Sequence, residues 1–595
     1  MSKKLNKKEG DYAKLHKIDK RAFLRVKNFY QSLIDDEKTD WISMFEENPY
    51  RLVEMEGYGF KRADMLAQKI GYNMESQNRI LAYVVYAVEL ISQGSTIINF
   101  IDLLNKVKKD LNLTNNSVLI DTIFNNSKGY LLLNSKCKRI SSKDINEGLE
   151  IPQYITTKTW FYTEKFVYEW LKNIEKLYKK KKDYNIQERI TSKCEYPLSE
   201  EQMKIVDGIL DKNINLIIGK SGTGKSYSTK KVLDLLDSYG LSYCLLSPTG
   251  IASVNILDKT GREAQTIHSR YYSNMSKQGQ PSPIEEDYII IDEVGMCGVD
   301  HFKMIKEMIP EKDVKIIFIG DKYQLGSISA GDFLSSIMKL IKNKIVDGNI
   351  FELNTIMRAS SESFIPYLSN MFCDKSRFDS SIINKKDLKG VSFVKRTDNL
   401  KEQLSNIVKD KKWEFENTAI IIPQRVGDFG CNPINDYFHD ILKSPILYSD
   451  EKGYKKYKKG DTLMHLRNDR MKGIFNGERV DLIDKKDDYT YVLKRIYDGE
   501  IFEYNDEEMY SDVGLSYANT IHKLQGLTVE HVIFVCIKPH TFMLNRNIVY
   551  TSISRASKEV VIVYDEGMLE YSDRKTITDK RKTFLGLIAE MSKSK

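Results

Sequence analysis

The sequence predicts an α/β protein in which two parallel-sheet lobes follow a mainly helical region. Beyond residue 190, short apolar runs alternate with amphipathic segments, a pattern typical of parallel strands covered on both faces. Before that point, apolar residues recur at spacings of three and four, which favours helices. A chain of 595 residues is also too long for one core, since single cores stop growing at about 250–300 residues.

The N-terminal third is expected to be helical. Its first forty-odd residues are polar and basic, and residues 48–72 place apolar positions on both sides of Gly57-Tyr58-Gly59. This arrangement predicts two short helices around a glycine turn. Residues 76–112 and 155–178 have helical periodicity as well.

The two lobes are recognised by their strands. A charge run near residues 180–195 marks the main boundary. Strands are expected at 215–219, 243–247, 288–292 and 315–320 in the first lobe and at 418–422, 531–536 and 560–564 in the second. Residues 455–512 have short alternating strands, which predict a small β-barrel inserted into the second lobe.

Composition bounds the compartment and the partners. The net charge of +8 permits a polyanionic partner without proving one. Seven scattered cysteines, never spaced as C-x-x-C, argue against a disulfide framework or a zinc site, and we expect them to be reduced and mostly buried. No uninterrupted apolar run of membrane-spanning length occurs, and the basic start lacks an apolar stretch. We therefore expect a cytoplasmic protein without membrane contact.

Residues 219–226 form a candidate phosphate-binding loop. Their sequence, GKSGTGKS, fits G-x-x-x-x-G-K-[ST] between an apolar run and an amphipathic segment, the context that this motif needs. Glycines let backbone N–H groups close around a phosphate of ATP, Lys225 neutralises phosphate oxygens, and Ser226 ligates Mg²⁺. The predicted nucleotide-binding residues are Gly219, Ser221, Gly222, Thr223, Gly224, Lys225 and Ser226.

Asp292 and Glu293 follow the apolar run 288–291, which places both carboxylates at the carboxyl edge of a parallel sheet, where ligands bind. We expect Asp292 to hold magnesium through water and Glu293 to orient and deprotonate the attacking water. A solvated acidic strand end is the alternative. The preceding phosphate-binding loop favours the catalytic interpretation.

A phosphate-binding loop alone leaves kinases, transporter ATPases and GTPases open, so the later motifs decide. They are SPTGIAS (247–253), TIHS (266–269), IDEVGM (291–296), GDKYQL (320–325), IMR (356–358), YANTIHKLQG (517–526) and YTSISRASK (550–558). This ordered set resembles motifs Ia to VI of superfamily 1 helicases, and LSEEQ (198–202) resembles their adenine-reading Q motif. T-G-x-A-S, T-I-H, D-E-V and H-K-x-Q-G are similar to RecD-like helicases, the 5′-to-3′ branch.

The resemblance spans about residues 45–565 and implies an α/β fold: two RecA-like parallel-sheet motor lobes, an inserted small SH3-like β-barrel and an α-helical N-terminal region containing a helix-hairpin-helix. The expected domains are a helical region at 1–190 with the helix-hairpin-helix at about 45–75, lobe 1 at 191–350, lobe 2 at 351–454 and 513–570, the barrel at 455–512 and a C-terminal tail at 571–595. RecD-like enzymes place a duplex-splitting β-hairpin pin where residues 270–287 lie; a plain surface loop fits this segment equally.

The resemblance also implies roles for matching residues. Gln202 would read adenine, Gln324 would couple the γ-phosphate to DNA contacts, and Arg358 and Arg555 would act as arginine fingers. Together with Lys225, Asp292 and Glu293, the last three complete the expected catalytic set. For a single arginine, a surface ion pair is the alternative.

DNA contacts are expected from motifs Ia, Ib and V and from the glycine turn. The chosen residues are Pro248, Thr249, His268, Thr520, His522, Gln525, Gly57 and Gly59. Hydroxyl, amide and backbone N–H groups can follow a single strand without reading its sequence. Packing histidines and an ordinary helical hairpin are the alternatives, and the run of lysines at 455–459 can equally be a solvated face.

The resulting prediction is an ATP-dependent DNA helicase that translocates 5′ to 3′ on single-stranded DNA. ATP and Mg²⁺ are its expected cofactors, and single-stranded DNA and single-strand/duplex junctions its partners. We expect a monomeric motor in DNA repair, recombination or replication, with a replication or recombination protein as partner. A DNA-stimulated ATPase that remodels protein–DNA complexes without unwinding, and an RNA helicase of the related branch, are the alternatives.

Overall fold

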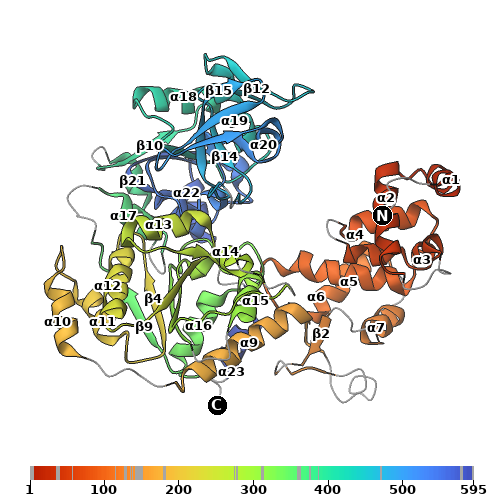
Figure 1. Ribbon diagram of the computed structural model, residues 1–595, viewed down its shortest axis with the longest axis horizontal. Helices are drawn as coiled ribbons and strands as arrows, with labels where there is room; N and C mark the ends of the chain where they lie inside the picture. The colour runs from red at the N-terminus through yellow and green to blue at the C-terminus, as the bar shows by residue number, and fades with distance from the viewer. Residues whose placement is uncertain are drawn as a thin grey trace. The chain divides into compact units, whose positions relative to one another are not determined.

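The chain divides into two compact units in this computed structural model (Figure 1). The first comprises residues 1–165 and 582–591, the second residues 166–581 and 592–595, so the division falls within helix α9 (Lys158–Ile174). The structure describes residues 6–591 except 35–39, 56–57, 114–115, 126–129, 135, 137, 141–151, 178–182, 274, 276–278, 310–313, 358–362, 374–376, 386–387, 470–471 and 576–580.

The first unit is mainly helical, as expected. It contains α1 (Lys7–Leu15), α2 (Lys20–Gln31), α3 (Trp41–Glu47), the 3-10 helix η1 (Pro49–Glu54), α4 (Phe60–Lys69), α5 (Gln77–Ser92), α6 (Phe100–Leu111), α7 (Asn116–Asn125) and α23 (Phe584–Met591). A three-stranded antiparallel sheet, β1 (Ile98–Asn99), β3 (Tyr154–Thr157) and β2 (Tyr130–Leu133), completes it. The expected pair of short helices around the glycine turn is η1 and α4.

Two predicted helical stretches are shorter than expected. Residues 76–112 are not one helix, because Gln93 and Gly94 adopt positive φ angles of 44° and 88° after α5, and β1 precedes α6. Residues 155–157 belong to β3, and helix α9 begins only at Lys158. Both breaks contain short strands with buried apolar residues, Ile98 in β1 and Ile155 in β3, so the apolar residues alone do not mark where the helices end.

Lobe 1, in the second unit, is built on a six-stranded parallel sheet in the order β6-β5-β7-β8-β4-β9. Its strands are β4 (Ile214–Gly219), β5 (Tyr243–Ser247), β6 (Gln265–Thr266), β7 (Tyr288–Ile291), β8 (Lys315–Gly320) and β9 (Asn349–Leu353). Helices α11 (Glu200–Gly208) and α12 (Lys225–Ser238) lie on one side, and α15 (Val299–Met308) and α16 (Phe333–Lys342) on the other (Figure 1). All four predicted strands of this lobe are confirmed.

Lobe 2 has a five-stranded parallel sheet in the order β10-β21-β20-β11-β19. These strands are β10 (Val391–Lys395), β11 (Thr418–Ile421), β19 (Ala518–Asn519), β20 (Val529–Cys536) and β21 (Ala556–Tyr564). One face packs against α17 (Ile365–Asn370), α21 (Arg546–Ile553) and α22 (Met568–Arg574), and the other against α18 (Leu400–Asp410) and α19 (Cys431–Ile441). The three strands predicted here are also confirmed.

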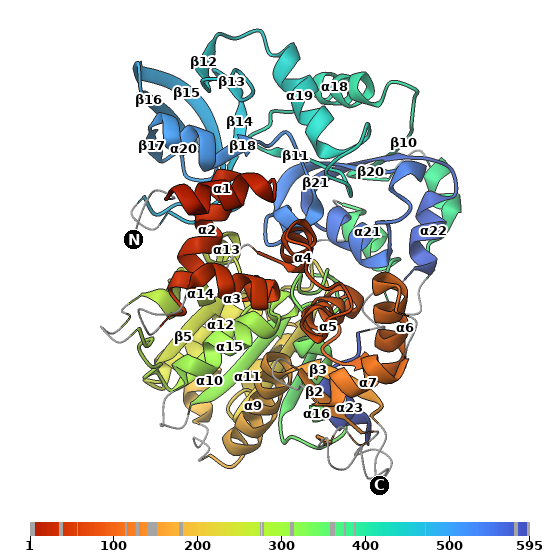
Figure 2. The ribbon, with the colours of Figure 1, turned by 90° about the vertical axis from the view of Figure 1, so that its right-hand side faces the viewer.

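An antiparallel insert interrupts lobe 2 (Figure 2). Its five-stranded sheet has the order β17-β16-β15-β14-β18, with β14 (Thr462–His465), β15 (Arg479–Asp487), β16 (Thr490–Arg495), β17 (Ile501–Tyr504) and β18 (Val513–Leu515). A separate hairpin, β12 (Ile446–Ser449) with β13 (Lys456–Lys458), precedes it. The insert has its own core, which includes Tyr448, Leu482 and Phe502.

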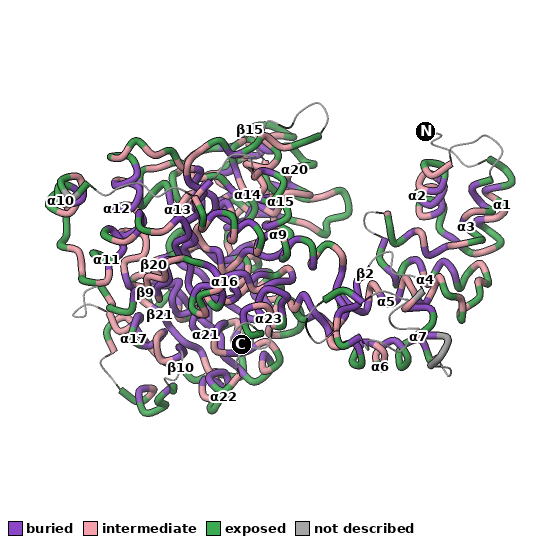
Figure 3. Tube along the Cα trace, turned by 90° about the horizontal axis from the view of Figure 1, so that it is seen from below, coloured by how far each residue is buried: buried purple, intermediate pink, exposed green. Residues whose placement is uncertain are grey.

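The interior strands are more deeply buried than the outer helices (Figure 3). Strands β4 and β7 are buried throughout, whereas α10 (Tyr184–Ser192) is mostly exposed or half-buried. The six described cysteines are free thiols, and five of them are buried. Every helix in the described part of the chain is too short or too polar to cross a membrane.

Candidate active site

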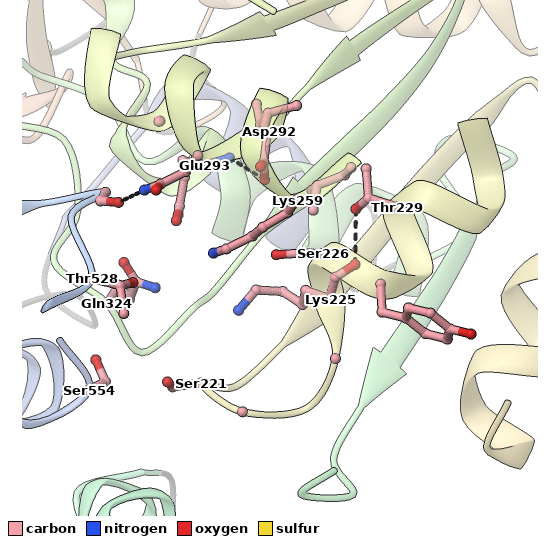
Figure 4. A pocket seen from close by; sticks show the side chains of 18 of the residues that line it. Ser221, Lys225, Ser226, Thr229, Lys259, Asp292, Glu293, Gln324, Thr528 and Ser554 are labelled. Atoms are coloured by element: carbon pink, nitrogen blue, oxygen red, sulfur yellow. Dashed lines mark hydrogen bonds between the residues drawn. The ribbon is translucent and has the colours of Figure 1, made fainter. Parts of the chain in front are cut away.

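A cavity of about 360 Å³ lies between the two lobes of the second unit (Figure 4). Lobe 1 contributes the phosphate-binding loop, the acidic pair Asp292 and Glu293, and Gln324. Lobe 2 contributes Gly526, Thr528, Ser554 and Arg555. Figure 4 shows Lys225, Ser226 and Glu293 around the same space. Residues that were predicted separately along the sequence therefore meet in one place.

The phosphate-binding loop runs from the end of β4 to the first turn of α12. Gly222 and Gly224 have φ angles of 80° and 82°, a region that side chains with a Cβ rarely adopt. A Cβ on Gly219 would lie 2.7 Å from both Thr223 Oγ1 and Lys225 Cγ. The glycines therefore supply the tight turn that directs backbone N–H groups into the cavity at the N-terminus of a helix.

Lys225 is held by backbone and carboxylate groups. Its Nζ donates to the carbonyl oxygen of Gly219. It also lies 3.5 Å from Oδ2 of Asp321, which stands in the loop after β8. The Asp321 side chain is fully buried. The ammonium group is thus anchored at the position where the motif expects a phosphate contact.

Gln202 lies beside the loop but outside the cavity lining. Its Oε1 accepts from Ser199 N at 3.1 Å, which closes a capping box at the start of α11. Its Nε2 lies 2.5 Å from the position that a Cβ on Gly224 would take. The described contacts of Gln202 are thus with the start of α11, and its amide group lies close to Gly224 of the phosphate-binding loop.

The acidic pair sits at the carboxyl end of β7, as expected. Glu293 N donates to Oδ1 of Asp292 at 2.8 Å, and Glu293 adopts a left-handed conformation with φ 51°. Burial, followed by the neighbouring Glu293 carboxylate, raises the pKa of Asp292 to about 7. Two crowded carboxylates with one raised pKa form a place where a divalent cation would relieve repulsion.

Arg555 reaches the cavity from lobe 2. It is 6% exposed; its Nε donates to Thr551 O at 3.2 Å and its Nη1 to Leu527 O at 3.1 Å. Burial lowers its pKa, while the Glu293 carboxylate acts in the opposite direction. The guanidinium group is held by backbone carbonyls and lines the same cavity as the acidic pair.

Arg358 lies outside the described residues. The segment before it reaches the site, because Met357 lines the cavity and its N–H donates to Gly222 O at 2.9 Å. Gln324 lines the cavity as well, with Nε2 3.5 Å from Asp321 Oδ2. Among the described residues, Gln324 Oε1 is a buried acceptor without a hydrogen-bond partner.

Three residues in or beside the site were not predicted from the sequence: Lys259, Tyr550 and Asp321. Lys259, near the end of α13 (Gly250–Thr260), lines the cavity and is directed into it in Figure 4. Tyr550 contacts both Ser221 and Asp321. Tyr550 belongs to motif VI and Asp321 to motif III, so membership of these motifs could have identified both as site residues. Lys259 belongs to no motif, and the sequence offers no comparable indication for it.

The predicted DNA residues of lobe 1 gather near the N-terminus of α13. Thr249 is the N-cap of this helix, and its Oγ1 accepts from Ala252 N at 3.3 Å. Pro248 is buried, and its carbonyl binds His301. His268 and His301 pack edge to face with ring centroids 5.2 Å apart. These four residues form one polar cluster at the carboxyl edge of the sheet.

The predicted residues of motif V have mixed surroundings. Thr520 is half-buried and lines a second cavity with Arg425, Tyr454 and Lys523. Burial lowers the pKa of the half-buried His522. Gln525 is 3% exposed and donates to Leu325 O at 3.1 Å, which joins the two lobes.

Two further expectations concern loops. In the first unit, Gly57 lies outside the described residues, whereas Gly59 caps α4 and a Cβ built on it meets nothing within 4 Å. In the second unit, residues 274 and 276–278 of the expected pin lie outside the described residues. The rest of 270–287 contains the end of α14 (Ile267–Tyr272) and no strand.

Three protein-family models match separate parts of the chain. Residues 16–97 match the ATP-dependent RecD2 DNA helicase HHH domain, residues 197–372 an AAA domain, and residues 515–563 a UvrD-like helicase C-terminal domain. The resemblance to RecD-like helicases is thereby confirmed.

The chain has distant relatives among known proteins. The chain is 26% identical over 371 residues to the ATP-dependent RecD2 DNA helicase of Deinococcus radiodurans, covering 62% of this chain and 49% of that protein. It is 25% identical to the RecBCD enzyme subunit RecD of Buchnera aphidicola, covering 60% of this chain and 70% of that subunit. An uncharacterized protein of Methanocaldococcus jannaschii is 25% identical, with 91% of this chain and 55% of that protein covered. The chain thus spans about half the length of two of these relatives.

Among solved structures, a Bacteroides Pif1 helicase in complex with ADP-AlF3 and single-stranded DNA is similar. It matches with a TM-score of 0.42 and 20% identity, covering 64% of this chain and 94% of that one. The Pif1 helicase of Candida albicans matches with a TM-score of 0.41 and 16% identity, covering 67% of this chain and 99% of that one.

Proposed function

We propose that this chain, which resembles RecD-like superfamily 1 helicases, is an ATP-dependent DNA helicase that translocates 5′ to 3′ on single-stranded DNA and unwinds duplex. The observation that carries the proposal is the single cavity to which one lobe brings Lys225 and the acidic pair and the other brings Arg555. A site completed by two lobes allows nucleotide turnover to change the distance between them.

The residues of lobe 1 suit Mg-ATP. Lys225 would neutralise phosphate oxygens, and Ser226 and Asp292 would hold Mg²⁺, which when bound supplies charge neutralisation for phosphoryl transfer. The raised pKa of Asp292 beside Glu293 fits a cation at this point. Glu293 would orient the attacking water and accept its proton. Gln324 would sense the γ-phosphate by donating from its side-chain amide nitrogen.

Arg555 would stabilise charge in the transition state from lobe 2, and we assign the same role to Arg358. An arginine finger contributes about 10³–10⁵ in rate in other NTPases. The two carbonyl groups that accept hydrogen bonds from Arg555 would fix its guanidinium group in place before hydrolysis begins.

Single-stranded DNA would cross the carboxyl edges of both sheets. Thr249 and His268 of lobe 1 and Thr520 and His522 of lobe 2 are the contacts that we favour, with a van der Waals contact from Pro248 and a supporting role for Gln525. Hydroxyl and amide groups of this kind follow a backbone without reading bases.

In the first unit, we propose that the turn at Gly57 and Gly59 binds a duplex phosphate through its N–H groups. Arg25 and Arg62 lie over the Tyr58 ring, 5.3 and 5.9 Å from its centroid. They would add positive charge to this turn.

We also propose the finer organisation. Lobe 1, expected at 191–350, would extend to the end of β9 at residue 353, and lobe 2 would follow it up to residue 570. The insert, expected at 455–512, would extend through β18 to residue 515 as an SH3-like barrel, after a helical region at 1–190. A monomeric, cytoplasmic motor acting with a replication or recombination protein in DNA repair, recombination or replication fits this organisation.

A strand-displacement assay with tailed duplexes tests the activity, the substrate and the direction together. We expect ATP-dependent unwinding of a duplex with a 5′ single-stranded tail. Unwinding from a 3′ tail alone would overturn the polarity. DNA-stimulated hydrolysis without unwinding would favour a remodelling ATPase, and stimulation by single-stranded RNA in preference to DNA would favour an RNA helicase.

A further inference from the structure

Tyr550 is a fully buried phenol of lobe 2 whose polar partners both belong to lobe 1. Its hydroxyl accepts from Ser221 N at 2.7 Å and donates to Asp321 Oδ2 at 2.6 Å. Ser221 belongs to the phosphate-binding loop, and Asp321 also approaches Lys225 at 3.5 Å. One hydroxyl group therefore joins the two segments of lobe 1 that surround the phosphate position.

Tyr550 lies in α21. This helix forms hydrogen bonds with lobe 1 at two further points. Asn547 Nδ2 donates to Tyr323 O at 2.9 Å, and Thr551 Oγ1 accepts from Leu325 N at 3.1 Å. Residues 547, 550 and 551 are spaced i, i+3 and i+4, so they share one face of α21. All three are less than 10% exposed. This face of α21 is thus docked on residues 321–325 of lobe 1.

Arg555 lies two residues beyond the end of α21 and five residues after Tyr550. Its Nε is held by the carbonyl of Thr551, in the last turn of the helix. Any shift of α21 relative to the phosphate-binding loop would therefore move the guanidinium group with it. Of the three docking side chains, Tyr550 alone has a hydrogen bond to that loop among the described residues.

We propose that Tyr550 is a positioning residue for ATP hydrolysis, whose hydroxyl fixes the register between the phosphate-binding loop and the helix that presents Arg555. The inference rests on the proposed function, because it assigns Arg555 a role in turnover. A phenol that only filled space would need no hydroxyl; here a buried hydroxyl is satisfied as donor and as acceptor across the lobe interface.

The test is Tyr550→Phe in the full chain, which removes one oxygen atom. We expect kcat for ATP hydrolysis with single-stranded oligodeoxythymidylate to fall by about tenfold or more, since a misplacement of 1 Å can cost about 10²-fold in rate. KM for ATP should stay close to that of the parent chain, because Lys225 and the loop glycines remain. Tyr30→Phe is the matched control: Tyr30 is fully buried and its hydroxyl donates to Asn48 O at 2.6 Å in the first unit.

A double-mutant cycle shows whether Tyr550 acts through Arg555. Adding Tyr550→Phe to Arg555→Ala should slow hydrolysis no further, because the group that it positions is gone. Additive losses would overturn the inference, as would an unchanged kcat. A loss of cooperative melting in Tyr550→Phe, with Tyr30→Phe still folded, would assign the hydroxyl a structural role and also overturn it. Absence of ATP hydrolysis in the parent chain would instead defeat the proposed function.

Discussion

Arg555→Ala tests whether lobe 2 takes part in hydrolysis. The two hydrogen bonds that Arg555 donates, to Thr551 O and Leu527 O, would be lost, and both carbonyl groups would lack that donor. At about 1 kcal/mol for each bond, the free energy of unfolding should fall by about 2 kcal/mol. Loss of an arginine finger should lower kcat by about 10³-fold or more, far beyond what such destabilisation explains in a chain that remains folded.

Arg479→Ala is the matched control for this experiment. Arg479 is 5% exposed, lies in β15 of the insert, and its Nη2 donates to Phe415 O at 2.6 Å. It lines no part of the nucleotide cavity. Steady-state ATP hydrolysis with single-stranded DNA and thermal melting should be measured on both variants. If Arg555→Ala hydrolyses ATP as fast as Arg479→Ala, Arg555 contributes only stability and the finger assignment is wrong.

Four further predictions follow from local geometry. Lys225→Ala should abolish hydrolysis and unwinding together, and hydrolysis by the purified variant would discredit the phosphate site. Lys259→Ala should raise KM for ATP by about tenfold, the equivalent of one charged hydrogen bond of about 1.5 kcal/mol, in steady-state kinetics. Gly250→Ala places a Cβ 2.4 Å from Phe475 Cβ and should cost about 1–3 kcal/mol of stability; in thermal melts this cost should disappear in a Phe475→Gly background, where the clashing Cβ is absent. Burial lowers the pKa of His301 to about 4, so the unfolded chain binds the proton more readily between about pH 6.5 and pH 4; about 2 kcal/mol of stability should be lost from pH 7 to pH 5, and His301→Gln should flatten that part of the profile in urea melts.

The strands that the sequence predicted are the interior ones. In lobe 1 these are β5, β7, β8 and β4, and in lobe 2 β21, β20 and β11. Strands covered on both faces are continuous apolar runs. The missed strands β6, β9, β10 and β19 are the four edges of the two sheets. Edge strands such as Gln265–Thr266 and Asn349–Leu353 are short or half-buried, so their sequences lack that signal.

The residues of the candidate site also divide into those that local motifs predict and those that no local pattern predicts. Lys225, Ser226, Asp292 and Glu293 were predictable because each belongs to a local motif at the end of a strand. Tyr550 is 229 residues from its partner Asp321, and no local pattern specifies such a pairing. The contact depends on how α21 docks on the other lobe, which only the tertiary structure determines.

Helix α13 illustrates how a local element gains a role from its neighbours. Thr249 caps its N-terminus beside the expected DNA path, and Lys259 lies near its other end in the nucleotide cavity. Between them, Asn255 Nδ2 donates to Gly526 O of lobe 2. Eleven residues at 1.5 Å per residue span about 16 Å. We expect α13 to move as one unit, so that a shift caused by phosphate at Lys259 would displace Thr249 and Asn255 at the lobe interface together.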